Sequence, residues 1–197
     1  MTGADRPVLL LATGNAGKVR EVQVLLPHVE VLSLKDRPLD MPEETGTTFE
    51  ANAVLKAEHA SRALGIPVLA DDSGLSVDAL AGSPGVRSAR YAPGTDEDRY
   101  LALLAALEGV ENRAARFECA MAFAVPGRET LRTHGRCEGK IAKSPRGTGG
   151  FGYDPVFELL DGRSMADLSR EEKNTVSHRG DALRQMLSHL ETYLRPS

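Results

Sequence analysis

The sequence has no tryptophan, only two cysteines and few other aromatic residues, and each scarcity excludes a class of protein. Five phenylalanines and four tyrosines among 197 residues are too few and too scattered to form a stacking platform for nucleic-acid bases. Cys119 and Cys137 each lie in a strand-like segment, and no CxxC or His-rich spacing suggests zinc. We therefore expect two buried thiols rather than a disulfide or a metal cluster.

A long apolar run and an excess of positive charge are also missing. No stretch approaches the roughly 20 apolar residues that a membrane-spanning helix needs, and the first residues do not resemble a secretion signal. The formal net charge is −4, so no overall basic field attracts nucleic acid. We expect a cytoplasmic protein that binds neither membranes nor nucleic acid. A polyanionic small substrate would need local cations or a metal ion.

What is present is an ordinary globular composition, with strands and helices in mixed order. The chain is 41% hydrophobic and 26% charged, and it is long enough for one domain with a substantial core. Apolar runs and helical spacing of apolar residues predict the elements. Strands are expected at residues 7–13, 29–34, 67–70, 74–80, 116–125 and 129–141, and helices at 18–26, 48–64, 96–107 and towards the carboxyl end. This order predicts a single α/β domain spanning residues 1–197, with a long central mixed β-sheet flanked by helices.

Two acidic stretches are candidates for a metal site. Asp71 and Asp72 follow an apolar run, and α/β proteins place ligand chemistry at the carboxyl ends of strands. Glu43 and Glu44 lie in a polar loop. Mg²⁺ usually takes one or two protein carboxylates together with substrate phosphate, so Glu43 and Asp72 are the predicted ligands. A hydrogen-bonded turn remains the alternative for the aspartates, and a solvated loop remains the alternative for the glutamates.

Three further stretches contain candidate contacts for phosphates and a base. Residues 13–18, TGNAGK, lie where the first strand turns into the first helix, and a helix start suits phosphate. The spacing is not that of a P-loop. Asn52 and Lys56 are four residues apart, so both can meet one ligand. Residues 147–155, GTGGFGYDP, allow close backbone approach and include two aromatic rings.

A fourth stretch, which contains cationic side chains, lies near the start of the final predicted helix. Lys173, His178 and Arg179 are donors for a phosphate or for an oxygen of a base. Each stretch also has an ordinary structural interpretation, as a helix cap, a glycine loop or a solvated helix end. Together, however, acids for a metal, cations for phosphates and an aromatic ring for a base indicate an enzyme that acts on nucleotides.

Six motifs resemble those of the inosine triphosphate pyrophosphatase family. In chain order they are ATGNAGK, EETGTTFEANAVLKA, ADDSGLSVDAL, PGVRSARYA, GTGGFGYDPVF and SHRGDAL, and they extend from about residue 8 to residue 190. The resemblance implies hydrolysis of deaminated purine nucleoside triphosphates (ITP, dITP, XTP) to the monophosphate and pyrophosphate. It also implies a requirement for Mg²⁺, a homodimer, and two lobes with the active-site cleft between them.

The resemblance further implies a role for each matching residue. Glu43 and Asp72 would hold Mg²⁺, and Asp72 would also be the base that activates water. Ser73 and Lys56 would contact the substrate. The triphosphate would lie on Thr13, Gly14, Asn15, Ala16, Gly17 and Lys18. The nucleotide would be enclosed by Phe151, Gly152, Tyr153, Asp154, Lys173, His178 and Arg179. For base selection we expect His178 or Arg179 to donate to the oxygen at C6 of the base.

One position departs from the family pattern. Members often have an acid directly before the asparagine of the second helix, whereas Ala51 precedes Asn52 here and the acid is Glu50. A one-residue shift rotates a side chain by about 100°, so we assign Glu50 no catalytic role.

Two other functions stay open. The alternatives are a related pyrophosphatase for pyrimidine or modified nucleotides, and a nucleotide sensor without turnover.

Overall fold

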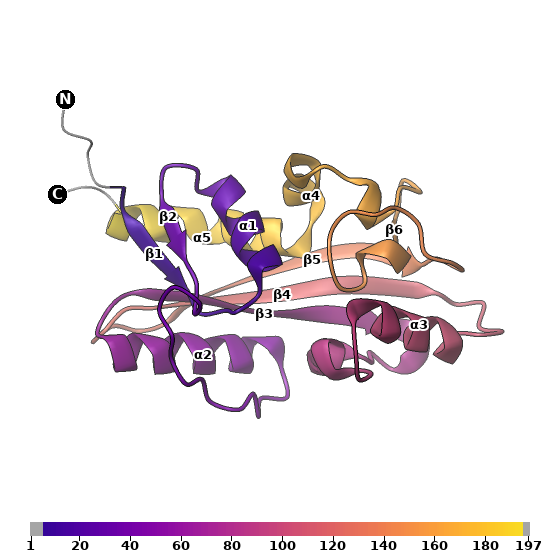
Figure 1. The fold of residues 1–197 in the computed structure, drawn as a ribbon, viewed down its shortest axis with the longest axis horizontal. Coiled ribbons are helices and arrows are strands. Elements are labelled where there is room, and N and C mark those ends of the chain that lie inside the picture. Colours follow the sequence, from indigo (N-terminus) through magenta and orange to yellow (C-terminus); the bar gives the residue numbers. More distant parts are fainter. Residues whose placement is uncertain (1–5, 195–197) are drawn as a thin grey trace.

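A mixed β-sheet of six strands runs through the centre of the molecule (Figure 1). The computed structural model describes residues 6–194. β1 pairs in parallel with β2 and with β3, and the remaining neighbours pair antiparallel in the order β2-β1-β3-β4-β5-β6. The strands are β1 (Val8–Leu11), β2 (Glu30–Leu32), β3 (Val68–Val77), β4 (Ala114–Ala124), β5 (Leu131–Ile141) and β6 (Phe157–Leu159).

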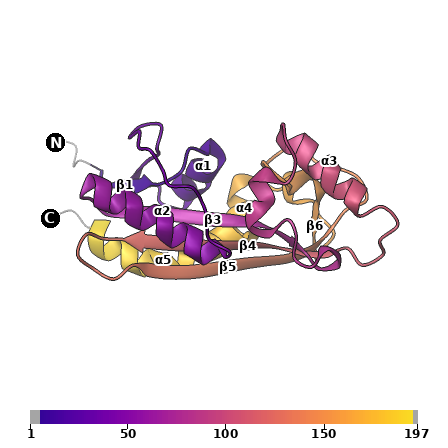
Figure 2. The ribbon, with the colours of Figure 1, turned by 90° about the horizontal axis from the view of Figure 1, so that it is seen from below.

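Five α-helices surround this sheet in the described part of the chain. Figure 1 shows α2 on the opposite side of the sheet from α5, and Figure 2 shows α3 at the end of the molecule far from β1. Local signals set the bounds of α2: Thr48 accepts the Ala51 N–H at its start, and Gly65 adopts a left-handed φ of 67° at its end. The helices are α1 (Ala16–Leu25), α2 (Phe49–Leu64), α3 (Asp96–Ala106), α4 (Arg170–Val176) and α5 (His178–Leu194).

The core is divided between the two faces of the sheet. Successive side chains of a strand point to opposite faces. Leu69 of β3 therefore packs in a cluster with Val22 of α1 and Leu183 of α5. Its neighbour Ala70 belongs to a cluster with Ala53 of α2. This alternation also decides which way the polar residues further along β3 point.

The structure confirms the predicted fold class and corrects two of the predicted elements. Residues 67–70 and 74–80 were expected as two strands, but β3 continues from Val68 to Val77 because β4 pairs with it along its whole length. A separate short helix, α4, precedes the final helix. The ends of the predicted domain, at residues 1 and 197, lie outside the described residues. The two-lobe arrangement stays a prediction.

No helix within residues 6–194 combines the length and the apolar character that crossing a bilayer requires. Both cysteines are buried and free, as expected. Burial raises the pKa of Cys119 to about 12 and that of Cys137 to about 11, so both remain thiols at neutral pH.

Candidate active site

The site forms because β1 is much shorter than β3. β1 pairs with β3 only at its last residues, where Leu11 lies opposite Leu69, and the Ala12 N–H donates to the Leu69 carbonyl at 2.8 Å. Beyond this point the chain turns away into α1, whereas β3 continues with Asp71 and Asp72. The edge of β3 that β1 leaves unpaired therefore borders a cavity of about 460 Å³, a size within the usual range for ligand pockets.

The cavity brings together most of the residues that the sequence predicted. Its wall includes Thr13, Gly14, Asn15, Lys18, Lys56, Asp72, Ser73, Phe151, Gly152, Tyr153, Asp154, Lys173, His178 and Arg179. Three predicted residues, all within the described chain, do not line it: Ala16, Gly17 and Glu43. Gly17 lies just behind the wall, since a Cβ there would come within 2.7 Å of the Phe151 ring.

The adjacent aspartates point to opposite faces of the sheet. Asp71 faces α1 and α5, where its carboxylate lies 2.9 Å from Lys18 Nζ and 3.1 Å from Arg179 Nε. Burial raises the pKa of Asp71, but the two cations lower it more, so the net pKa lies well below its usual range. Asp71 is thus a permanently charged anchor behind the wall. The prediction that the pair ends a strand is wrong, because both residues lie in the interior of β3.

Asp72 faces α2 and lines the cavity. The Asn52 side-chain amide donates to its carboxylate at 3.0 Å, and Lys56 Nζ lies 3.5 Å away. Burial raises the pKa of Asp72 above its ordinary value, although Lys56 and the Asn52 hydrogen bond oppose the shift. A raised pKa makes a carboxylate a better proton acceptor. The helix spacing of Asn52 and Lys56, predicted from the sequence, is what places both beside this carboxylate.

The acidic loop places Glu44, not Glu43, on the wall. Glu44 accepts a hydrogen bond from Lys56 at 2.8 Å and lies 3.9 Å from Arg90. Burial raises the pKa of Glu44, but Lys56 lowers it more, so this carboxylate stays charged. Glu43 is exposed, one residue away in the same loop. The assignment of Glu43 as a metal ligand therefore stays a prediction.

These oxygens fit Mg²⁺ shared with a triphosphate. No group of three or more His, Cys, Asp or Glu side chains within residues 6–194 is arranged to hold a metal by itself. Mg²⁺, however, commonly binds through one or two carboxylates and takes its other oxygens from water and substrate phosphates. Asp72 and the acidic loop supply carboxylates of this kind on one side of the cavity.

A buried acid on α1, which sequence reasoning missed, fixes two of the predicted cations. Glu21 pairs with Lys173 at 2.7 Å and with Arg179. Asp154 holds the same Lys173 ammonium at 2.5 Å. No local pattern marked Glu21, because its partners Lys173 and Arg179 lie far along the chain. Because Arg179 also donates to Asp71 and Ser73, three of its nitrogens are already committed to the protein.

Another part of the cavity wall is aromatic. The Phe151 ring has Lys173 Nζ 4.6 Å and the Arg179 guanidinium 5.6 Å from its centroid. His178 stacks on Phe117, with ring centroids 4.8 Å apart. Burial, together with Arg179 and Lys173, holds the pKa of His178 well below its usual range, so it is a neutral imidazole. Its Nδ1 is buried without a hydrogen-bond partner among the described residues.

Several wall residues had no role predicted from the sequence. Ser88 is one of them, and the Tyr153 hydroxyl donates to its carbonyl at 2.8 Å. Asp96 and Arg99 reach the cavity from the start of α3. The sequence predicted α3 but gave no sign that its first turn faces the glycine loop, because this contact joins residues 56 positions apart.

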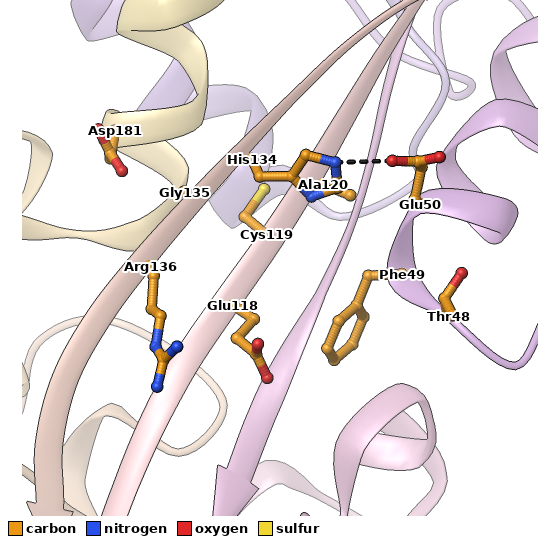
Figure 3. Close-up of a pocket in the computed structure, with 10 residues that line it drawn as sticks. All are labelled: Thr48, Phe49, Glu50, Glu118, Cys119, Ala120, His134, Gly135, Arg136 and Asp181. Carbon is orange, nitrogen blue, oxygen red and sulfur yellow. Dashed lines mark hydrogen bonds and ion pairs between the residues drawn. The ribbon is translucent and has the colours of Figure 1, made fainter.

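A second hollow, of about 470 Å³, lies beside the start of α2 (Figure 3). Its wall includes Thr48, Phe49, Glu50, Glu118, Cys119, Ala120, His134, Gly135, Arg136 and Asp181. Figure 3 shows Glu50 facing His134, with 2.7 Å between Glu50 Oε2 and His134 Nε2. Glu50 thus lines this second hollow and not the Asp72 cavity, whereas Asn52 is directed to the Asp72 carboxylate.

Comparisons with known proteins show the family to which the chain belongs. Residues 9–189 match the model of the Ham1 family, and the chain belongs to this family. A Geobacillus kaustophilus protein named dITP/XTP pyrophosphatase is 57% identical over 187 residues, covering 90% of this chain and 91% of the relative. A Symbiobacterium thermophilum protein of the same name is 52% identical, covering 94% and 96%. The solved Ham1 protein of Coxiella burnetii superimposes with a TM-score of 0.84 at 42% identity, covering 94% of this chain and 99% of that one.

Proposed function

We propose that the protein hydrolyses deaminated purine nucleoside triphosphates, such as ITP, dITP and XTP, to the nucleoside monophosphate and pyrophosphate. The observation that most supports this is Asp72, a largely buried carboxylate on the cavity wall with Asn52 and Lys56 beside it. Two relatives that align with over nine tenths of their own length are named for dITP and XTP.

The chemistry follows from the order of charges across the cavity. Asp72 accepts a proton from the attacking water. Lys18 and Lys56 hold the phosphates, and the first N–H groups of α1 add partial positive charge on the same side. Lys173 fixes the nucleotide from the aromatic side. When bound, Mg²⁺ would supply positive charge that offsets the charge developing on the leaving pyrophosphate.

For the metal, we propose Asp72 and Glu43 as protein ligands. Asp72 lines the cavity, and the family resemblance implies Glu43. Glu44 lines the cavity, but Lys56 and Arg90 already neutralise its carboxylate. An exposed carboxylate in the same loop loses less by binding a cation, because it gives up no existing ion pair.

Base selection rests on His178 more than on Arg179. Three Arg179 nitrogens already donate to Asp71, Glu21 and Ser73. A neutral His178 can donate one N–H to the C6 oxygen of hypoxanthine or xanthine. The amino group of adenine would oppose that donor, and leaving a buried donor unpaired costs about 1–3 kcal/mol. This accounts for discrimination against ATP but not against GTP, which has the same C6 oxygen.

Three broader features belong to this proposal. We propose one domain over residues 1–197, with the active-site cleft between its two lobes. We also propose a homodimer and a cytoplasmic location. The supports are the family resemblance, the match over residues 9–189 and the absence of a membrane-spanning helix from the described residues.

A substrate panel tests the function. Purified protein with Mg²⁺ is assayed against ITP, XTP, GTP, ATP and dUTP, with pyrophosphate and orthophosphate detected separately. We expect pyrophosphate from ITP and XTP and little from ATP. Orthophosphate alone would show that a different bond is cut. A preference for dUTP would favour the pyrimidine alternative, and tight ITP binding without product would favour the sensor.

A further inference from the structure

The glycine-rich loop that leads into β6 is anchored to α3 by one side chain. The Gly152 N–H donates to Asp96 Oδ2 at 2.7 Å. Two other hydrogen bonds of the loop stay closer in sequence: the Phe151 N–H donates to Asp154 Oδ2, and the Gly149 N–H donates to the Ala166 carbonyl. Asp96 therefore ties this loop to a distant element of the fold.

The anchored peptide lies between two rings of the cavity wall. Phe151 packs against Gly17 on one side and has Lys173 Nζ over its ring on the other. Tyr153 is fixed by its hydroxyl, which donates to the Ser88 carbonyl. Gly152 has a φ of 63°, a left-handed conformation that glycine adopts without strain. Glycine has more conformational freedom than other residues, and the hydrogen bond to Asp96 restricts that freedom at Gly152.

Asp96 is itself held in place by its own helix. It is the first residue of α3, where a carboxylate interacts favourably with the helix dipole. Its Oδ1 lies 2.5 Å from an Arg99 guanidinium nitrogen, and Arg99 also donates to the Gly94 carbonyl at 3.0 Å. One carboxylate oxygen of Asp96 therefore faces Arg99 and the other faces Gly152. Asp96 and Arg99 both line the cavity.

We propose that Asp96 is a positioning residue for the nucleotide: through the Gly152 N–H it sets the place of the Phe151 and Tyr153 rings against which the substrate binds. This inference rests on the proposed function, because the rings matter only if a nucleotide occupies the cavity. Asp96 takes no part in the bond cleavage. Its loss should weaken substrate binding more than it slows the chemical step.

The test compares three variants by steady-state kinetics with ITP and Mg²⁺. Asp96→Ala removes the acceptor, and we expect KM to rise about tenfold while kcat changes much less. Asp96→Asn keeps an oxygen that can accept the Gly152 N–H, and we expect it to restore most of the affinity. Glu97→Ala is the matched control, because it removes an exposed acid from the same helical turn and should behave as wild type.

A second readout does not depend on turnover. Hydrogen–deuterium exchange of peptides covering residues 147–155 should be faster in Asp96→Ala than in wild type, and unchanged in Glu97→Ala. If Asp96→Ala does not fold, Asp96→Ser replaces it, since the serine side chain is too short to reach Gly152. A wild-type protein without pyrophosphate release would contradict the proposed function, while the exchange experiment would still test the anchor.

Two results would overturn the inference. Unchanged KM and unchanged exchange in Asp96→Ala would show that the loop holds its position without this hydrogen bond. An Asp96→Asn variant as impaired as Asp96→Ala would show that the charge opposite Arg99, rather than the acceptor for Gly152, is what matters.

Discussion

At the residue scale, the site depends on two neighbouring carboxylates that strand geometry assigns to different tasks. Asp71 is buried, and its Oδ2 contacts both Lys18 and Arg179, so its charge organises the cations. Asp72 points to the other face and meets the cavity. The sequence predicted a pair of acids at a site, and it could not show this division because it indicated a break in β3. An unbroken strand of ten residues makes alternation, rather than a turn, the deciding factor.

The loop acids give the first prediction. We expect Glu43→Gln to raise the Mg²⁺ concentration for half-maximal activity about tenfold, because a neutral amide binds the cation more weakly than a carboxylate. Glu44→Gln, which breaks the ion pair with Lys56, is the comparison and should change the Mg²⁺ requirement less. Magnesium titrations of both variants check this. The opposite order would transfer the metal to Glu44, the acid that lines the cavity.

At the element scale, α5 lies on β5 only because a glycine lets it approach. A Cβ on Gly135 would fall 2.0 Å from the His178 carbonyl oxygen and 2.5 Å from the Ala182 nitrogen. Both are backbone atoms of α5, which cannot move without shifting the helix. The position of α5 matters because its first turn includes His178 and Arg179.

Gly135→Ala should therefore lower the free energy of unfolding by about 1–3 kcal/mol or more, the usual cost of overpacking. The control is Arg136→Ala, an exposed position on the same strand, which should stay within about 0.5 kcal/mol of wild type. Urea unfolding followed by circular dichroism measures both. Equal stability of the two variants would show that α5 does not need this close approach.

Elements were predictable to different degrees for physical reasons. The bounds of α2 were predictable, because a capping threonine and a terminal glycine mark them in the sequence. α4 was missed because seven residues give too little periodicity, although the capping box of Ser169 and Glu172 was an available signal. That Glu43 is exposed while Glu44 lines the cavity was not predictable, since loop conformation decides which of two adjacent acids faces a cavity.

At the scale of the whole molecule, a buried neutral histidine couples stability to pH. The pKa of His178 in the folded protein lies below its usual value of about 6.5. As the pH falls below that value, the unfolded chain binds a proton at this position that the folded chain does not bind. Unfolding is therefore favoured on acidification, and stability rises as the pH increases towards about 6.5.

Melting temperatures at pH 7.5 and pH 5 test this coupling. We expect wild type to lose more stability between these values than His178→Gln, which has no group to titrate there. His189→Gln, an exposed histidine on the same helix, should follow the wild type. Equal losses in wild type and His178→Gln would mean that other groups dominate the acid dependence.

The complete site is a property of the whole chain rather than of any segment. Its wall is assembled from the turn after β1, α1, α2, β3, α3, the glycine loop and the last two helices. Local patterns supplied candidate residues, and the family resemblance ordered them into one site. Contacts between distant segments, such as Glu21 with Arg179 and Asp96 with Gly152, follow only from the assembled fold.

In the proposed mechanism, Asp72 is the base for pyrophosphate release. The most direct measurement is turnover of ITP with Mg²⁺ by wild type and Asp72→Asn, together with the affinity of each for ITP. Asp72→Asn should lose at least about a hundredfold in kcat, while ITP should still bind within about tenfold of the wild-type affinity. Wild-type turnover by Asp72→Asn would show that Asp72 is not the base.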